Sequence, residues 1–129
     1  MTLLLPEQAP LARLTPRPND ANSKGDVFGG WLMSQMDMAG AVLAIRHAQG
    51  PVATVAVKDM TFIKPIFIHD VVSFYGEVTK TGKTSVTILL SAFSERFADN
   101  FSVVEKVSEG IFVYVAIVTP GHKRLLPTG

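Results

Sequence analysis

The pattern of apolar residues along the chain predicts one helix followed by four long strands. Good helix formers fill residues 31–48 and stop before Gly50, and two basic residues, Arg46 and His47, stand in the last turn. Glycine is a common helix end, and the helix dipole favours positive charge there. The chain after Gly50 is rich in β-branched residues, which favour strands. The predicted strands are 52–63, 70–80, 85–96 and 103–119, with a tight turn at 81–83. This order predicts an α+β fold with a long antiparallel sheet.

The segment before the helix is mostly irregular in its pattern. Residues 1–10 contain Pro6 and Pro10 and predict an irregular lead-in, and 11–15 predict a short strand. Residues 16–26 are dense in turn formers and predict a loop. Since the chain has no linker or repeat and its 129 residues suit one core, we predict a single domain over 1–129.

The predicted helix is apolar on every side. Between Trp31 and Ile45 its only charged residue is Asp37. A helix that is apolar all round is a buried helix. The long sheet is therefore expected to wrap around one central buried helix.

Composition adds self-association to this picture. Hydrophobic residues make up 47% of the chain and charged residues only 18%, which is apolar for the surface of a small monomer. Burial against copies of itself would account for the excess. The net charge of +1 provides no field to attract nucleic acid or a membrane surface. The longest apolar run, 111–118, suits a buried strand and is too short to span a bilayer.

Several kinds of site are disfavoured by the sequence. The chain has no cysteine, which excludes disulfides, thiolate metal sites and cysteine nucleophiles. Its three histidines, His47, His69 and His122, show no metal-binding spacing, and no serine stands in a nucleophile elbow. Residues 1–6 lack the basic start of a signal peptide, so we predict a cytoplasmic location.

The lone acid of the helix is the first candidate for chemistry. Residues three and four positions from Asp37 are Met33, Ser34, Gly40 and Ala41, which are apolar or small. A carboxylate in such surroundings pays a large desolvation cost unless donors meet it. Asp37 could also cap a nearby loop or reach water at an interface. The small residues 39–41 favour a functional role because they let a partner or a narrow ligand approach closely.

The second candidate is the glycine-rich segment 25–30 at the start of the helix. Unpaired amides there can donate to an oxygen that gains negative charge, although a glycine turn can also serve backbone geometry alone. Gly30 lies seven residues before Asp37, about 10 Å along a helix axis. A donor and an attacking group must each lie about 3 Å from the same carbonyl group. One helix hardly supplies both, whereas two antiparallel copies can, so we predict a site shared across a dimer interface.

Residues 19–40 resemble the signature of hotdog-fold acyl-CoA thioesterases, and in particular that of the small bacterial YciA-like subgroup. Residues 54–65 and 82–85 match later blocks of the subgroup, and the resemblance covers about 11–119. It implies the hotdog fold and hydrolysis of acyl-CoA to a free fatty acid and CoA. No cofactor is implied beyond the coenzyme A of the substrate.

The resemblance also implies roles for individual residues. Asp37 matches the nucleophile or general base, and Asn22 matches an asparagine that orients the water or the reacting group. The amide of Gly30, with that of Gly29, matches the group that polarises the thioester carbonyl. Members form dimers whose sheets join edge to edge, and the dimers gather as trimers or pairs.

Two positions depart from the pattern of the family. His69 stands where members usually have glycine, in the turn before the second long strand. Lys83 replaces a more frequent arginine, which keeps the positive charge but loses the planar fork that grips phosphate.

The CoA site is expected at two places. The phosphates need cations or backbone donors, and the turn at Lys83, Thr84 and Ser85 offers them, although it could equally be a hairpin turn with a solvated lysine. The pantetheine arm is expected along the strand 57–62, with Lys64 as a further contact. The candidate residues on that strand are Val57, Met60, Thr61 and Phe62.

Three alternatives to this interpretation remain open. Asp20 and Asp26 share a loop with Asn22, but aspartates in such loops more often serve as turn and N-cap residues. A hotdog enoyl-CoA hydratase would need an acid–base histidine near the helix start, where the chain has Gly29 and Gly30. A non-catalytic acyl-CoA-binding module would need the pocket but not Asp37.

Overall fold

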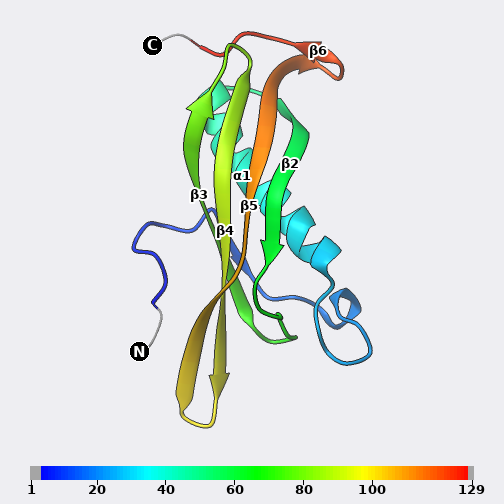
Figure 1. Cartoon of the computed structure of the whole chain (residues 1–129), viewed down its shortest axis with the longest axis vertical. Coiled ribbons are helices and arrows are strands. Elements are labelled where there is room, and N and C mark those ends of the chain that lie inside the picture. Colours follow the sequence, from blue (N-terminus) through cyan, green and yellow to red (C-terminus); the bar gives the residue numbers. More distant parts are fainter. Residues whose placement is uncertain (1–3, 128–129) are drawn as a thin grey trace.

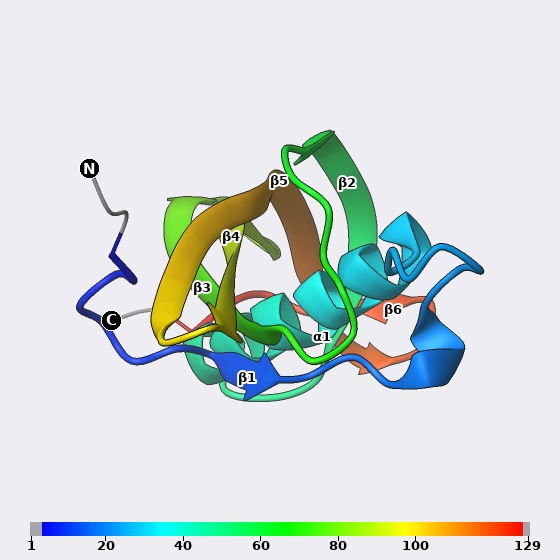
Figure 2. The same ribbon diagram turned by 90° about the horizontal axis from the view of Figure 1, so that it is seen from below.

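One curved antiparallel sheet packs against a single long helix (Figures 1 and 2) in the computed structural model, which describes residues 4–127. The elements follow the predicted order of a short strand, a helix and four long strands. They are β1 (Ala12–Leu14), the 3-10 turn η1 (Pro18–Asp20), α1 (Gly29–Ala48), β2 (Val52–Phe62), β3 (Val71–Thr81), β4 (Ser85–Ala98), β5 (Phe101–Thr119) and β6 (His122–Lys123). The predicted α+β arrangement is confirmed.

The sheet has the strand order β1-β3-β4-β5-β2, with the short β6 added to β5. All strand pairs are antiparallel. The strand β2 follows the helix in the chain but lies at the far edge of the sheet, beside β5. Its outer edge has no partner among the described residues, and it stands at the rim of the curved sheet (Figure 2).

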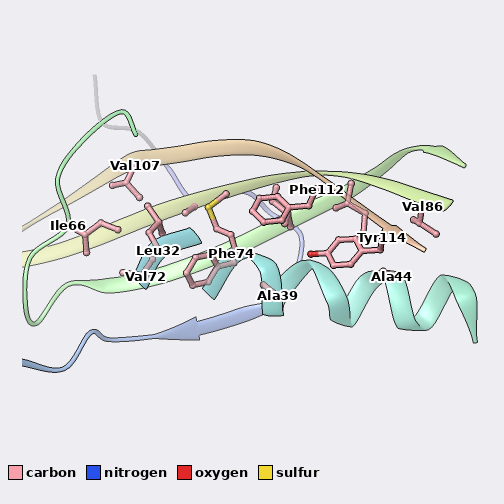
Figure 3. Close-up of a cluster of buried hydrophobic side chains, with 14 residues drawn as sticks. Leu32, Ala39, Ala44, Ile66, Val72, Phe74, Val86, Val107, Phe112 and Tyr114 are labelled. Carbon is pink, nitrogen blue, oxygen red and sulfur yellow. The ribbon is translucent and has the colours of Figure 1, made fainter. Parts of the chain in front are cut away.

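The core lies between the concave face of the sheet and one side of α1 (Figure 3). The helix contributes small and medium side chains, and the strands contribute larger ones. The helix residues are Leu32, Met36, Ala39 and Ala44, and the largest strand residues are Phe74, Ile88, Leu90, Phe112 and Tyr114. Gly40 permits the closest approach, since a Cβ atom there would overlap the Tyr114 hydroxyl and lie 2.7 Å from Cδ1 of Leu90.

The expected burial of the helix holds only on the side that faces the sheet. On the opposite side Met38 is 54% exposed and Ile45 is 45% exposed, with Met33 and Val42 also exposed. The sheet of one chain covers only one side of a helix that is apolar all round. The apolar remainder fits the prediction that the chain associates with copies of itself.

Element boundaries differ from the prediction by two residues in three places. The helix begins at Gly29, two residues early, because glycine is tolerated in a first turn that has few backbone bonds to satisfy. The strands β4 and β5 continue to Ala98 and Phe101, where a loop was expected. Their tight turn uses Asp99 and Asn100 at φ of 46° and 71°, a left-handed pair that closes hairpins without glycine.

The backbone at His69 explains why glycine is usual at this position in the family. His69 has φ of 78°, in the left-handed region that favours glycine. A side chain with a Cβ atom is strained there by about 1 kcal/mol. We expect His69→Gly to raise the free energy of unfolding by about 0.5–1 kcal/mol, measured as a higher Tm at fixed protein concentration. His122→Gly, at an exposed strand residue without positive φ, serves as the control and should give no gain. An unchanged or lower Tm for His69→Gly would contradict this account.

Candidate active site

The carboxylate of Asp37 is held by a donor from the sheet. Thr54 Oγ1 donates a hydrogen bond of 2.6 Å to Asp37 Oδ1, a length typical of a hydroxyl that donates to an ionised carboxylate. Asp37 is half-buried in the middle of α1. An acid in apolar surroundings was expected to need a hydrogen-bond donor, and Thr54 supplies one.

Thr54 belongs to β2, and the pairing of β2 with β5 explains its position. Thr54 lies directly opposite Tyr114 in the register of the two strands, so both side chains point to the same face of the sheet. The register shifts directly after Thr54, between Thr54 and Ala56. Thr54 lies in a block that matches the family, but its role could not be predicted, because the register of strands 60 residues apart cannot be read from the sequence.

The second strand residue holds the backbone of the same helical turn. The Tyr114 hydroxyl donates a hydrogen bond of 2.7 Å to the main-chain carbonyl oxygen of Asp37. Burial raises the pKa of Tyr114, and the negative charge of Asp37 raises it further. Tyr114 therefore stays neutral and keeps its proton for the carbonyl. Two neighbouring strands thus fix Asp37 through its side chain and its backbone.

The start of α1 offers free amide donors, as the sequence predicted. Gly29 and Gly30 are the first two helical residues, and the first backbone hydrogen bond of the helix runs from Trp31 N to Phe28 O, at 3.1 Å. The N-cap residue Phe28 supplies no side-chain acceptor. A Cβ atom on Gly30 would meet no atom within 4 Å, so the space beside it is open. An oxygen from outside the chain can reach this helix end.

Asn22 lies in its own loop and is not brought to Asp37 within the chain. Its Oδ1 accepts backbone hydrogen bonds from Lys24 at 2.9 Å and from Asp26 at 3.1 Å, and its backbone N–H donates to the Asp26 carbonyl oxygen. The side-chain oxygen is thus used to hold the loop, which orients the amide NH2 group. Within one chain Asn22 therefore contacts its own loop and not Asp37.

Asp20 behaves as the turn residue that was predicted. Its carboxylate accepts the Arg17 backbone amide at 2.8 Å and pairs with the Arg17 side chain. The side chain of Asp20 is therefore engaged in holding η1 together.

A pocket of about 280 Å³ lies beside the glycines. It brings two of the predicted CoA-binding residues, Phe62 and Lys64, to the helix start. Its lining residues are Val27, Phe28, Gly29, Leu32, Phe62, Ile63, Lys64, Pro65 and Ile66. The other candidates on β2 differ in exposure. Val57 and Thr61 are exposed, whereas Met60 is half-buried and packs on the core.

The Lys83 turn lies at the opposite end of the helix. A pocket of about 450 Å³ is formed there by His47, the turn 81–83 and the C-terminal residues 125–127. Thr84 and Ser85 are half-buried, and their carbonyl oxygens accept hydrogen bonds from Ala116 and Gly82. Of the three predicted residues in this turn, only Lys83 lines the pocket.

The described residues contain neither a metal-binding cluster nor a helix that could span a membrane. Across residues 4–127 no group of three or more histidine, aspartate or glutamate side chains is placed to hold a metal ion. No helix in that range combines the length and the apolar character needed to cross a bilayer.

Comparison with known proteins places the chain in a family. The model of the thioesterase superfamily matches residues 24–96. The acyl-CoA thioester hydrolase YciA of Salmonella typhimurium is 42% identical over 95% of this chain and 92% of its own length. The hexameric thioesterase y2039 of Yersinia pestis is 42% identical, with a TM-score of 0.87, over 97% of this chain and all of that one. The hexameric broad-specificity acyl-CoA thioesterase HI0827 is 40% identical, with a TM-score of 0.88, over 97% of this chain and 85% of that one.

The chain belongs to the thioesterase superfamily and has its hotdog fold, as the resemblance in the sequence implied. Within that superfamily it is grouped with the YciA-type acyl-CoA thioester hydrolases.

Proposed function

We propose that this thioesterase hydrolyses acyl-CoA at a site shared by two protomers. Asp37 of one protomer acts as nucleophile or general base, and the amides of Gly30 and Gly29 of the other polarise the thioester carbonyl. The oxygen that attacks, from Asp37 or from a water that it deprotonates, adds to the carbonyl carbon. The carbon–sulfur bond then breaks, and CoA leaves as the thiolate. Attack by water yields the free fatty acid directly, whereas attack by Asp37 leaves an acid anhydride that a water then cleaves to the fatty acid and the free carboxylate. Coenzyme A takes part only as half of the substrate.

The observation that carries this proposal is the hydrogen bond from Thr54 to Asp37. It ties up Oδ1 in a fixed direction and leaves Oδ2 for the substrate or water. The residue is also open on the side away from the sheet, where α1 exposes Met38 and Val42. An oriented carboxylate beside an uncovered apolar surface is what attack on a bound acyl thioester requires.

The second protomer is supported by the bare surfaces of α1 and β2. The eleven-residue edge of β2 exposes Val55 and Val57 and has no partner among the described residues. Pairing with the same edge of another copy would continue the sheet and satisfy its backbone groups. We propose this dimer as the unit that completes the site, with dimers assembled further into a hexamer like those of the solved relatives.

The ends of α1 provide two directions for the substrate. Asp37 lies eight residues after Gly29 and ten before His47, about 12 Å and 15 Å along the axis. We propose that the CoA phosphates lie near Lys83, which supplies a positive charge to the pocket beside His47. The remaining candidates, Phe62, Lys64 and the exposed residues of β2, stay predictions for the pantetheine arm, and the cytoplasmic location stays a prediction of the sequence.

Replacing Thr54 tests this geometry. We expect Thr54→Val to lower kcat by about 10-fold or more with KM little changed, because the shape is kept but the donor that orients Asp37 is lost. Thr54→Ser keeps the hydroxyl and should retain most of the activity. The measurement is CoA release from an acyl-CoA substrate by steady-state kinetics. Equal kcat for the valine and serine variants would show that the hydrogen bond does not serve catalysis.

A further inference from the structure

One buried charge has no part in the proposed reaction. Asp70, the last residue of the loop between β2 and β3 (residues 63–70), is 1% exposed and is the only buried charged side chain among residues 4–127. Its carboxylate accepts two hydrogen bonds from Arg96, of 2.9 Å and 2.7 Å, one of 2.8 Å from the Ser94 hydroxyl and one of 3.0 Å from the Phe67 backbone amide. A buried ionic group often adds no net stability compared with apolar residues of similar size. A gain in stability alone therefore does not account for Asp70.

Asp70 fixes one turn of this loop. Its Oδ2 accepts the Phe67 amide, and the Asp70 amide donates in return to the Phe67 carbonyl oxygen at 3.1 Å. The guanidinium of Arg96, which binds the Asp70 carboxylate from β4, also lies over the ring of Phe67, 4.6 Å from its centre. This cation–π contact holds the same residue a second time. Asp70 and Arg96 together therefore fix Phe67 by its backbone and by its ring.

This part of the loop is bonded to the chain just before α1. The backbone amide of Val27 donates to the Ile66 carbonyl oxygen at 2.8 Å, and Asp26 pairs with Phe67 in an isolated β-bridge. Val27 lies two residues before Gly29, the first helical residue. The position of the helix start relative to the sheet thus depends on the backbone of Ile66 and Phe67.

The same short segment also carries Asn22. Asp26 donates its backbone amide to Asn22 Oδ1 at 3.1 Å and accepts the Asn22 amide at 2.7 Å. Asp26 is thus bonded to Asn22 on one side and to Phe67 on the other. We refer to Asn22 with the amides of Gly29 and Gly30 as the glycine half-site. Both of its parts connect to the β2–β3 loop through the bonds of Asp26 and its neighbour.

We propose that Asp70 is a positioning residue for the glycine half-site of its own chain. The links run from its pair with Arg96 to Phe67, and across the β-bridge to the segment before α1. An amide donor is effective only when it lies close to 3 Å from the oxygen that gains charge, and a displacement of about 1 Å can cost about 100-fold in rate. Asp70 thereby acts on the reaction without touching the substrate.

The other half of the site is supported separately. Asp37 is held by Thr54 of β2 and by Tyr114 of β5, and none of the described hydrogen bonds of Asp70 reaches these residues. The inference rests on the proposed shared site, in which Asp37 and the glycine half-site that serve one substrate belong to different chains. Loss of the Asp70 charge should therefore impair the glycine half-site of its chain and leave Asp37 of that chain competent.

The first test is Asp70→Asn, which keeps the size of the side chain but places an NH2 group where a carboxylate oxygen meets donors. We expect kcat to fall at least about tenfold and KM to change less, because the amides act on charge that develops in the transition state. The matched control is Ser73→Ala. It removes another buried hydrogen bond to an arginine, 2.6 Å from Arg13 Nε to Ser73 Oγ, which links β1 to β3.

The control should lower Tm but keep kcat within about twofold, because its hydrogen bond is not linked to the helix start. An unchanged kcat in Asp70→Asn would overturn the proposal. An equal fall of kcat in the two variants would also overturn it, since lost stability would then explain the effect.

Mixed assemblies assign the defect to one half of the site. Co-expressed Asp70→Asn and Asp37→Ala chains should recover about a quarter of the wild-type turnover. Half of the randomly formed dimers are mixed, and one of their two sites combines an intact Asp37 with an intact glycine half-site. Asp70→Asn with Asn22→Ala should show no recovery, because both changes damage the glycine half-site and every site in the mixed dimer contains one of them.

The remaining outcomes also decide the matter. Recovery with Asn22→Ala but not with Asp37→Ala would show that Asp70 supports Asp37 instead. Recovery in both mixtures, or in neither, would reduce Asp70 to a role in the stability of the chain. A mixture of Asn22→Ala and Asp37→Ala chains tests the shared site without any change at Asp70. If it recovers activity and the Asp70→Asn/Asp37→Ala mixture does not, only the role of Asp70 fails, whereas its own failure would refute the shared site and the inference with it.

Discussion

Asp37→Ala is expected to lower kcat by at least about 100-fold on every acyl-CoA tested, since it removes the group that attacks or activates water. The fold should survive, because Asp37 is only half-buried and alanine is a better helix former. CoA release from a panel of short and long acyl-CoA substrates is the measurement. A variant with more than about a tenth of the wild-type turnover would refute the role of Asp37.

Two further variants serve as controls for this experiment. Asp20→Ala should lose stability through its contacts with Arg17 but keep kcat within about threefold. Asp37→Asn keeps the size of the side chain and should be nearly as inactive as Asp37→Ala. A wild type that binds CoA but hydrolyses no thioester would favour the non-catalytic binding module.

Mixed assemblies of Asn22→Ala and Asp37→Ala chains should recover activity that neither variant has alone. We propose that each site takes Asn22 from the chain that supplies the glycine amides and Asp37 from the other chain. One of the two sites in a mixed dimer then keeps both residues intact. Random 1:1 mixing makes half of the dimers mixed, so we expect about a quarter of the wild-type turnover. Co-expression with two affinity tags and steady-state kinetics measure it.

The same experiment separates a shared site from a site within one chain. If one chain supplied both Asn22 and Asp37 to a site, no site in the mixture would have both residues intact. Activity would then equal the mean of the two variants. The control is a mixture of Asn22→Ala chains with Asn22→Ala/Asp37→Ala chains, which has no intact site under either arrangement and should stay inactive.

Local patterns in the sequence predicted most of the fold and the two parts of the site, the acid and the amides. The all-round apolar helix pointed to Asp37, and the glycines before it pointed to the open amides, because both signals lie within one continuous segment. The positive φ of His69 likewise explains why that position usually holds glycine. Each of these conclusions depends on neighbours in the chain.

Contacts between distant segments could not be predicted. Thr54 reaches Asp37 only because β2 crosses to the far edge and pairs with β5 so that Thr54 lies opposite Tyr114. The long hairpin was missed because Asp99 and Asn100 close it without the glycine that usually marks such a turn. The exposed half of α1 was missed since a sequence does not show how far one sheet can curl.

The bare edge of β2 also governs how the protein must be made. In the proposed dimer the β2 edges of two copies pair, so a newly synthesised chain carries this edge unpaired until a second chain binds, and during that interval it can pair with any other extended segment. Production at low concentration lengthens the interval, while rapid overproduction crowds unfinished chains together. Mass action therefore ties the yield of intact enzyme to the rate of translation as well as to the sequence.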